Sequence, residues 1–269
     1  MAQDFTDDEV CFVPDSQIIF PSVFLSNVSA LRPPNCTYKI CFELLTQNCN
    51  YVILPSNYTD FSRLIIKKMP KFLKLLEEEI SKARANKTPE NEFYTKTRRV
   101  LVSHNIWERG YGDLILYWES NKQVFWEFVS IDLSLVRRKL LDLTLDKMRV
   151  FAKICEGHQV EFSEEEEKLS EGLYILIKDA KRKRTIQHSA NDEDLMILAE
   201  CFIYKNMRFL EGFVYLVTDD KELFGTTAEV VTQPYLIFPD FKQTEKFMGF
   251  EPLKPEKFVA EYNRQSHSA

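Results

Sequence analysis

Short hydrophobic runs alternate with segments of helical periodicity near both ends of the chain. The runs are bounded by Pro, Asp, Ser and Asn and are too short for buried helices, so they predict β-strands. The predicted strands are Val10–Val13, Tyr51–Leu54, Phe213–Val217 and Tyr235–Phe238. The predicted helices are Cys36–Gln47, a helix that begins at Thr59, and Leu195–Ile203. Strands that alternate with helices favour an α/β sandwich with a mostly parallel central sheet.

The middle of the chain has a different pattern. Residues 82–98 are polar, which predicts an exposed connection. Leu133–Ile154 has apolar residues at helical spacing, whereas Val124–Val129 fits either a strand or part of a helix. We therefore expect a mainly helical insertion, about 82–185, in a domain that spans 1–242. That domain is formed by two halves, about 8–75 and 186–242, and is followed by a C-terminal extension, 243–269.

Composition and net charge exclude some classes of protein and of binding site. The 269 residues are 45% hydrophobic, which is enough for a sizeable core. The net charge of -6 excludes a uniformly basic coat for nucleic acid, although a local basic face stays compatible with it. The six Cys residues form no CxxC pair and there are only four His, so a structural zinc site is not expected.

The amino-terminal residues and the lengths of the apolar runs bear on localisation. The first ten residues are acidic and polar, the reverse of a secretory signal, and the apolar runs are far too short to span a bilayer. We therefore expect an intracellular protein with reduced thiols and no membrane partner. The expected compartment is the cytoplasm, or the nucleus if the basic run 181–184 is a localisation signal.

Carboxylates lie where predicted strands end or predicted helices begin. They are Asp15, Asp60, Asp192, Asp194, Asp219 and Asp220. Because the carboxyl ends of parallel strands face one crevice, we expect these side chains to converge there. Each of them alone also fits a turn or a helix cap. As a group of hard oxygen ligands without His or Cys they favour Mg²⁺ or Mn²⁺, and two such ions can activate water to hydrolyse a phosphodiester.

Four segments resemble motifs of the PIN-domain ribonucleases. These segments are Val10–Ser16, an opening strand that ends in Asp-Ser; Asp194–Ala199, an Asp-x-x-hydrophobic-Leu-Ala helix start; Leu216–Leu223, a strand end with Thr-Asp-Asp; and Tyr235–Phe241, a last strand with its Pro-containing exit. The resemblance covers a little under half of the chain. It implies a three-layer α/β sandwich with a mostly parallel sheet.

The resemblance also implies a metal-dependent ribonuclease that hydrolyses single-stranded or structured RNA. It assigns Asp15, Asp60, Asp194 and Asp220 to the catalytic ions, Asp192 and Asp219 to additional acidic positions, and Ser16 and Thr218 to the positioning of carboxylates or water. Two features depart from the family. Asp60 stands where a Glu is usual, and the segment of about 110 residues between the two halves is an insertion.

Contacts to the RNA backbone are expected from basic clusters, although each cluster also fits an ordinary solvated face. The best placed is Lys181, Arg182, Lys183 and Arg184, which lies shortly before Asp192 and Asp194 in sequence. The others are Lys67–Lys68 with Lys71 and Lys74, Arg98–Arg99, and Arg137–Lys139.

Other functions fit the sequence less well. A catalytically inactive PIN-like protein that binds RNA or acts as a scaffold is the alternative, because Asp60 replaces Glu. A phosphatase with a nucleophilic Asp15 would need an acid two residues later, where the chain has Gln17. There is no G-x-S-x-G motif and no Walker glycine loop. Besides RNA, a protein inhibitor or a second copy of the chain is left open as a partner.

Overall fold

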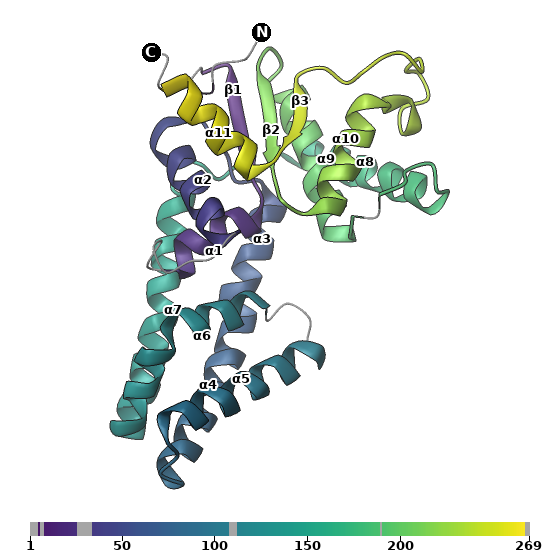
Figure 1. The fold of residues 1–269 in the computed structure, drawn as a ribbon. Coiled ribbons are helices and arrows are strands. Elements are labelled where there is room, and N and C mark those ends of the chain that lie inside the picture. Colours follow the sequence, from purple (N-terminus) through teal and green to yellow (C-terminus); the bar gives the residue numbers. More distant parts are fainter. Residues whose placement is uncertain (1–4, 6–7, 26–33, 108–111, 189, 267–269) are drawn as a thin grey trace. The chain divides into compact units, whose positions relative to one another are not determined.

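The computed structural model describes residues 5, 8–25, 34–107, 112–188 and 190–266 (Figure 1). The chain is mainly helical with a small parallel sheet, in agreement with the predicted α/β class. It divides into a sheet unit, formed by Met1–Ser22, Arg32–Asp60 and Cys155–Ala269, and a helical unit, formed by Val23–Leu31 and Phe61–Ile154. Within the described ranges, no helix combines the length and the apolar character needed to cross a membrane.

Three parallel strands form the centre of the sheet unit. In spatial order they are β1 (Val10–Pro14), β2 (Phe213–Val217) and β3 (Phe250–Leu253). Val10 pairs with Phe213 along the first ladder, so the two longest strands are those predicted from the sequence. Because all three strands run in the same direction, they end at one edge of the sheet. Asp15, Thr218 and Lys254 follow the three strand ends at this edge.

Helices cover both faces of the sheet (Figure 1). On one face Cys11 and Val13 belong to a core that includes α8 (Glu164–Arg182), α9 (Asp192–Met207) and α10 (Lys221–Thr232). On the other face the ring of Phe12 stacks on Tyr215 and meets Phe258 of α11 (Pro255–Ser266) edge-on. A strand that is buried on both faces has no polar side, which explains the uninterrupted apolar runs in the sequence.

The other helical segments that lie wholly or partly in the sheet unit connect these elements. They are α1 (Ser16–Phe24), α2 (Asn35–Asn48), α3 (Pro55–Arg63) and the 3-10 turn η4 (Pro234–Leu236). The prediction of a helix over Cys36–Gln47 is confirmed by α2, and that over Leu195–Ile203 by α9. The predicted strand Tyr51–Leu54 is reduced to isolated parallel bridges, which pair Phe12 with Tyr51 and Ile53 with Gln159.

The prediction of a last strand at Tyr235–Phe238 was wrong. Pro234 begins η4 instead, and its carbonyl oxygen accepts hydrogen bonds from the backbone N–H groups of Ile237 and Phe238 at 3.0 and 2.8 Å. The third strand is β3, within the segment that was predicted to be a C-terminal extension. It escaped detection because it is four residues long and contains Pro252, which an edge strand tolerates.

The prediction of an exposed connection over residues 82–98 was also wrong. Helix α4 (Met69–Ala85) continues to residue 85 and α5 (Glu90–Trp107) begins at residue 90. Helix α5 buries Phe93, Thr97 and Leu101, which are four residues apart and so lie on one helix face. A single buried side chain per turn, one of them a threonine, gives too weak an apolar signal to separate this helix from a polar loop.

The helical unit has its own aromatic core. Its other elements are the π-helical turn η2 (Leu64–Lys68), α6 (Gly112–Glu127), the 3-10 turn η3 (Phe128–Ser130) and α7 (Leu133–Cys155). Tyr117, Trp118 and Phe125 of α6 are buried, as are Phe72 of α4 and Phe93 of α5. The segment Val124–Val129, which fitted either a strand or a helix, is helical, and the helix predicted at Leu133–Ile154 is confirmed by α7.

A buried carboxylate links α9 to the start of α3. Glu200 is 6% exposed, and its two oxygens accept hydrogen bonds from the backbone N–H and the hydroxyl of Ser56 at 2.9 and 2.7 Å. Burial raises the pKa of Glu200 to about 7, although these hydrogen bonds favour the charged form. Between pH 4.5 and 7 the folded protein therefore keeps a proton that the unfolded chain has lost, so the stability contributed by Glu200 falls as pH rises through this window.

We predict that Glu200→Gln removes this pH dependence. The amide stays neutral, and the Ser56 hydroxyl can rotate to accept from it, so the variant should gain stability relative to wild type by up to about 3 kcal/mol between roughly pH 5 and 8. Urea unfolding of both proteins across this range measures the difference. A difference that does not change with pH would contradict the raised pKa.

Candidate functional site

Four carboxylates come from four different elements of the sheet unit. Asp15 directly follows β1, Asp220 precedes α10 beyond the end of β2, Asp194 lies in the first turn of α9, and Asp60 lies in α3. The parallel sheet places the residues after β1 and β2 at the same edge, because Pro14 pairs with Val217. Two of the candidate residues are therefore held close together by backbone pairing.

Asp15 is buried at this edge and has both oxygens engaged. Its Oδ1 accepts a hydrogen bond from the backbone N–H of Ser16 at 2.6 Å and lies 3.4 Å from the Ser16 hydroxyl. Its Oδ2 accepts from the Gln17 amide and from the Thr218 hydroxyl, each at 2.8 Å. Burial raises the pKa of Asp15, and the nearby charge of Asp60 acts in the same direction. The surrounding donors fix the orientation of the carboxylate.

The Thr218 hydroxyl joins the ends of β1 and β2. It donates to Asp15 and accepts from the Gln17 amide at 3.0 Å and from the backbone N–H of Asp220 at 3.1 Å. The residue is fully buried. One hydroxyl therefore positions Asp15 directly and Asp220 through its backbone.

We predict that Thr218→Val destabilises the protein by about 1–3 kcal/mol, because the buried partners of the hydroxyl lose a hydrogen bond while the side-chain shape is kept. The free energy of unfolding in urea gives this value. Thr218→Ser keeps the hydroxyl and is the matched control, so it should lose much less. Equal losses in both variants would show that the methyl group, rather than the hydroxyl, stabilises the site.

The pKa of Asp194 is sensitive to the other three carboxylates. It is the third residue of α9 and forms a capping box with Asn191: the Asn191 side chain accepts from the Asp194 N–H at 3.0 Å, and Asp194 Oδ2 accepts from the Asn191 N–H at 3.2 Å. Burial, followed by the charge of Asp15, raises the pKa of Asp194 to about 7, and the charges of Asp220 and Asp60 contribute to the same shift. The other three carboxylates are thus within electrostatic range of Asp194.

Asp220 caps the helix that follows it. Its Oδ1 accepts hydrogen bonds from the backbone N–H groups of Glu222 and Leu223, both at 2.8 Å. Among the described residues, its Oδ2 has no hydrogen-bond partner. The aspartate therefore anchors the start of α10 with one oxygen and keeps the other available for a ligand.

The additional acids, Asp192 and Asp219, have cationic partners. Asp192 pairs with Lys178 at 2.6 Å, and this hydrogen bond lowers its pKa. Asp219 accepts from the Tyr38 hydroxyl at 2.6 Å and from Lys254 at 2.9 Å. Burial opposes the ionisation of Asp219, but these two partners together hold its pKa below the usual value. Asp192 and Asp219 thus have a lysine partner, whereas the other four acids have none among the described residues.

The four carboxylates offer only oxygen ligands, the kind that hard divalent cations bind. Within the described ranges, Asp15, Asp60, Asp194 and Asp220 form no ion pair with Lys or Arg, and the charges of the other three contribute to the raised pKa of Asp194. Oxygen-only ligands of this kind favour Mg²⁺ or Mn²⁺. Across the same residues, no three His, Cys, Asp or Glu side chains are close enough in their present rotamers to hold an ion.

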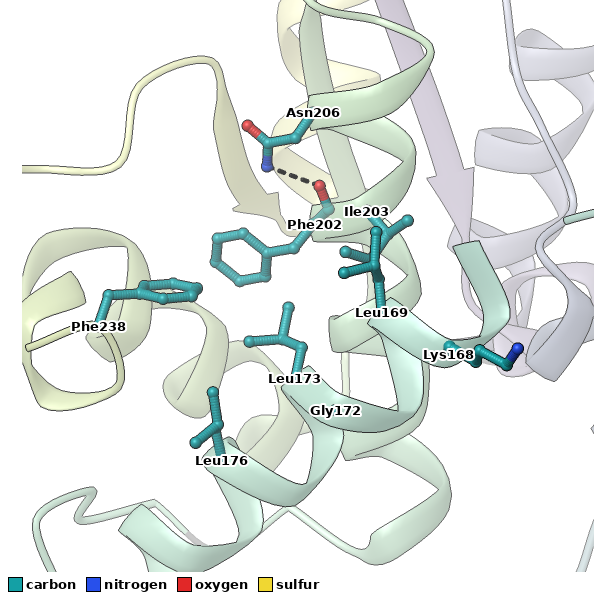
Figure 2. Close-up of a pocket in the computed structure, with 9 residues that line it drawn as sticks. All are labelled: Lys168, Leu169, Gly172, Leu173, Leu176, Phe202, Ile203, Asn206 and Phe238. Carbon is teal, nitrogen blue, oxygen red and sulfur yellow. Dashed lines mark hydrogen bonds between the residues drawn. The ribbon is translucent and has the colours of Figure 1, made fainter. Parts of the chain in front are cut away.

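A separate apolar groove lies farther along α9 (Figure 2). It has a volume of about 520 Å³ and is lined mainly by Leu169, Leu173 and Leu176 of α8, with Phe202 of α9 and Phe238. Figure 2 shows these side chains facing one another across the groove. Phe202 is eight residues beyond Asp194, roughly 12 Å along the helix axis. The groove contains none of the candidate carboxylates and is not part of their site.

The two units differ strongly in charge. The helical unit has 19 Lys and Arg against 12 Asp and Glu, a net charge of +7, so the sheet unit carries -13 of the total of -6. In the sheet unit, two members of the predicted RNA-binding run are engaged: Lys181 donates to the carbonyl of Ala190 at 2.6 Å, and Lys183 pairs with Asp179 at 2.6 Å. The run is therefore less available to RNA than its sequence suggests.

Exposed lysines lie at helical spacing where η2 continues into α4. Lys67 of η2 and Lys71 and Lys74 of α4 are spaced by four and three residues, and all three are exposed. Residues at this spacing lie roughly 5–6 Å apart along a helix. This lysine face is one of the basic clusters in the positively charged unit.

Comparison of the chain with known protein families, with curated proteins and with solved structures found no match.

Proposed function

We propose that the chain is a divalent-metal-dependent ribonuclease whose sheet unit is a three-layer, PIN-like sandwich. The observation that carries the proposal is the group of four aspartates, Asp15, Asp60, Asp194 and Asp220, drawn from four elements at the carboxyl edge of a parallel sheet. Each alone fits a cap or a turn. Burial and neighbouring aspartates raise the pKa of Asp15 and of Asp194, and none of the four acids pairs with Lys or Arg in the described ranges. A cation that binds between them explains this better than four separate caps and turns.

In this proposal the four aspartates hold Mg²⁺ or Mn²⁺, which supplies a Lewis acid for water activation and for the leaving oxygen. The chain's own residues orient the ligands. Gln17 and Thr218 donate hydrogen bonds to Oδ2 of Asp15. Asp220 is held by the hydrogen bonds that its Oδ1 accepts at the start of α10, which leaves its Oδ2 for the cation. Ser16 supplies a backbone donor to Asp15 in addition to the hydroxyl that was expected to act.

RNA is the proposed substrate, and its backbone contacts are assigned to the helical unit. A net charge of +7 and the lysine face support this assignment, because phosphate contacts from Lys and Arg dominate the affinity for nucleic acid. The sheet unit, at -13, would repel RNA except where cations neutralise the carboxylates. Metal binding and RNA binding are therefore expected to support each other at the site.

The test is to incubate the purified protein with a mixed RNA substrate in the presence of Mn²⁺, Mg²⁺ or EDTA. The proposal expects cleavage with either ion, products that carry 5′-phosphate and 3′-hydroxyl ends, and no cleavage in EDTA. Cleavage that persists in EDTA would point to a contaminating metal-independent nuclease. Absence of cleavage with every ion would contradict the proposal.

The alternative function is a catalytically inactive PIN-like protein that binds RNA or acts as a scaffold. Two observations favour it: Asp60 stands in place of the longer Glu, and in the described ranges no three acids are close enough to hold an ion as they stand. Calorimetric titration with Mn²⁺ separates the two functions. Saturable binding that is lost in Asp194→Asn supports the nuclease, whereas no binding supports the scaffold.

A further inference from the structure

Asn57 is fully buried, and its side-chain amide has no hydrogen-bond partner. The residue is 0% exposed, and among the described residues neither its Oδ1 nor its Nδ2 is paired. Five other side chains each leave a single buried atom unpaired: Ser22, Thr97, Trp118, Ser170 and Thr226. An amide can donate two hydrogen bonds and accept two, so Asn57 has the largest unmet capacity in the described part of the chain.

A buried amide without partners is costly to the fold. It has lost its hydrogen bonds to water without replacement, and roughly 90% or more of buried polar groups in proteins avoid this state. Leucine has nearly the same size and shape and would fit the position without this cost. An asparagine in such a place is typical of a site where a ligand or an ion completes the hydrogen bonding.

Asn57 lies in the first turn of α3, which is attached to α9 within the sheet unit. The preceding residue, Ser56, donates its backbone N–H and its hydroxyl to Glu200 of α9 at 2.9 and 2.7 Å. The buried amide therefore follows directly on a residue that contacts the helix whose first turn supplies Asp194.

Asp60 follows Asn57 by three residues on the same helix. Side chains at this spacing share a helix face, with about 5–6 Å between their Cβ atoms. They also lean toward the helix N-terminus, so the Asp60 carboxylate leans over the turn that holds Asn57. The charge of Asp60 acts on both Asp15 and Asp194. The unpaired amide thus lies one helical turn before an acid of the proposed cation site.

We propose that Asn57 is a positioning residue of this cation site and that its amide becomes paired when the cation binds. The inference rests on the proposed function, because it adds a residue to the same site. Nδ2 donates to the Asp60 carboxylate, and Oδ1 accepts from a water molecule on the cation, since Mg²⁺ keeps several waters when carboxylates bind it. Asp60 is one methylene shorter than the Glu that is usual in PIN-domain ribonucleases, and a water held by Asn57 takes up the difference.

Replacing Asn57 by leucine should have two opposite effects. Without metal the melting temperature should rise by about 2–6 °C, because two unpaired polar atoms are replaced by apolar atoms of similar volume. The affinity for Mn²⁺, measured by calorimetric titration, should fall about 10–100-fold, as is usual when a residue that orients metal ligands is lost. An asparagine that only stabilised the fold would give a lower melting temperature and unchanged Mn²⁺ binding.

Thr97→Val is the matched control for Asn57→Leu. Thr97 is also 0% exposed with an unpaired side-chain oxygen, but it lies on α5 in the helical unit. Its replacement should also raise the melting temperature without metal, and it should leave the affinity for Mn²⁺ unchanged. An Asn57→Leu protein that binds Mn²⁺ as tightly as wild type, or that melts at a lower temperature without metal, would overturn the proposal.

Asn57→Asp tests by charge whether residue 57 lies beside the cation. A second carboxylate next to Asp60 should lower the melting temperature without metal. Saturating Mn²⁺ should then raise the melting temperature by more than it does in wild type, because the added charge attracts the ion. A rise no larger than that of wild type would overturn the placement of Asn57 at the site. Wild type that does not bind Mn²⁺ at all would contradict the proposed function itself, and this role of Asn57 with it.

Discussion

Replacing Asp220 by asparagine is expected to lower the rate of RNA cleavage by about a thousandfold or more while RNA binding is retained. Asparagine is as good an N-cap as aspartate, so the hydrogen bonds to Glu222 and Leu223 and the start of α10 should survive. What is lost is the negative charge on the oxygen left free for the cation. Removing several kcal/mol of transition-state stabilisation gives a rate factor of this order.

The measurement is cleavage at saturating RNA and matched Mn²⁺, with fluorescence anisotropy of labelled RNA for binding. Asp192→Asn is the control within the same acidic segment, since Asp192 is exposed and paired with Lys178. It should cleave at close to the wild-type rate. An Asp220→Asn protein that cleaves as fast as wild type would remove the carboxylate site as the catalytic centre.

Exchanging Lys67, Lys71 and Lys74 for glutamine should reduce RNA affinity by tens of fold at low salt. Each phosphate contact to a single strand contributes about 0.7 to the slope of log affinity against log salt, so three contacts should make this slope less negative by about 2. Cleavage at saturating RNA should be unchanged, because none of the lysines belongs to the carboxylate site. Anisotropy titrations at several salt concentrations give both quantities.

The control replaces Lys181, Arg182, Lys183 and Arg184 by glutamine. This variant removes four charges instead of three, yet it should lose less affinity, because two of these side chains are held by contacts within the sheet unit. If the 181–184 variant loses more affinity than the lysine-face variant, the RNA-binding surface lies on the sheet unit and the assignment to the helical unit is wrong.

The strands of the sheet differ in how clearly the sequence predicts them. β1 and β2 are uninterrupted apolar runs because both of their faces are buried, and such runs are visible without an alignment. β3 has an exposed Glu251 and contains Pro252, so as an edge strand it has no such run. Tyr235–Phe238 has the composition of a strand, but Pro234 begins a turn that local apolar content does not reveal.

The candidate site is predictable to the extent that it depends on local sequence. Asp15 and Asp220 directly follow recognisable strands, and Asn191 with Asp194 has the spacing of a capping box. The contacts that distinguish the acids are long-range: Gln17 reaches Thr218, and Lys254 reaches Asp219. Residues that meet only after the sheet forms have no fixed spacing in the sequence. The partners of Asp219 and the hydrogen bonds from Gln17 to Asp15 and Thr218 could therefore not be predicted.

The pairing of Val10 with Phe213 has a consequence for biosynthesis. Roughly 200 residues separate the two strands, which corresponds to about 10–40 s of translation at 5–20 residues per second. Phe61–Ile154 of the helical unit is continuous in sequence and leaves the ribosome within this interval. Asp15 is made 203 residues before Thr218, the residue whose hydroxyl donates to it. While the chain between Asp15 and Thr218 is being made, the carboxylates of the proposed site are therefore not yet assembled.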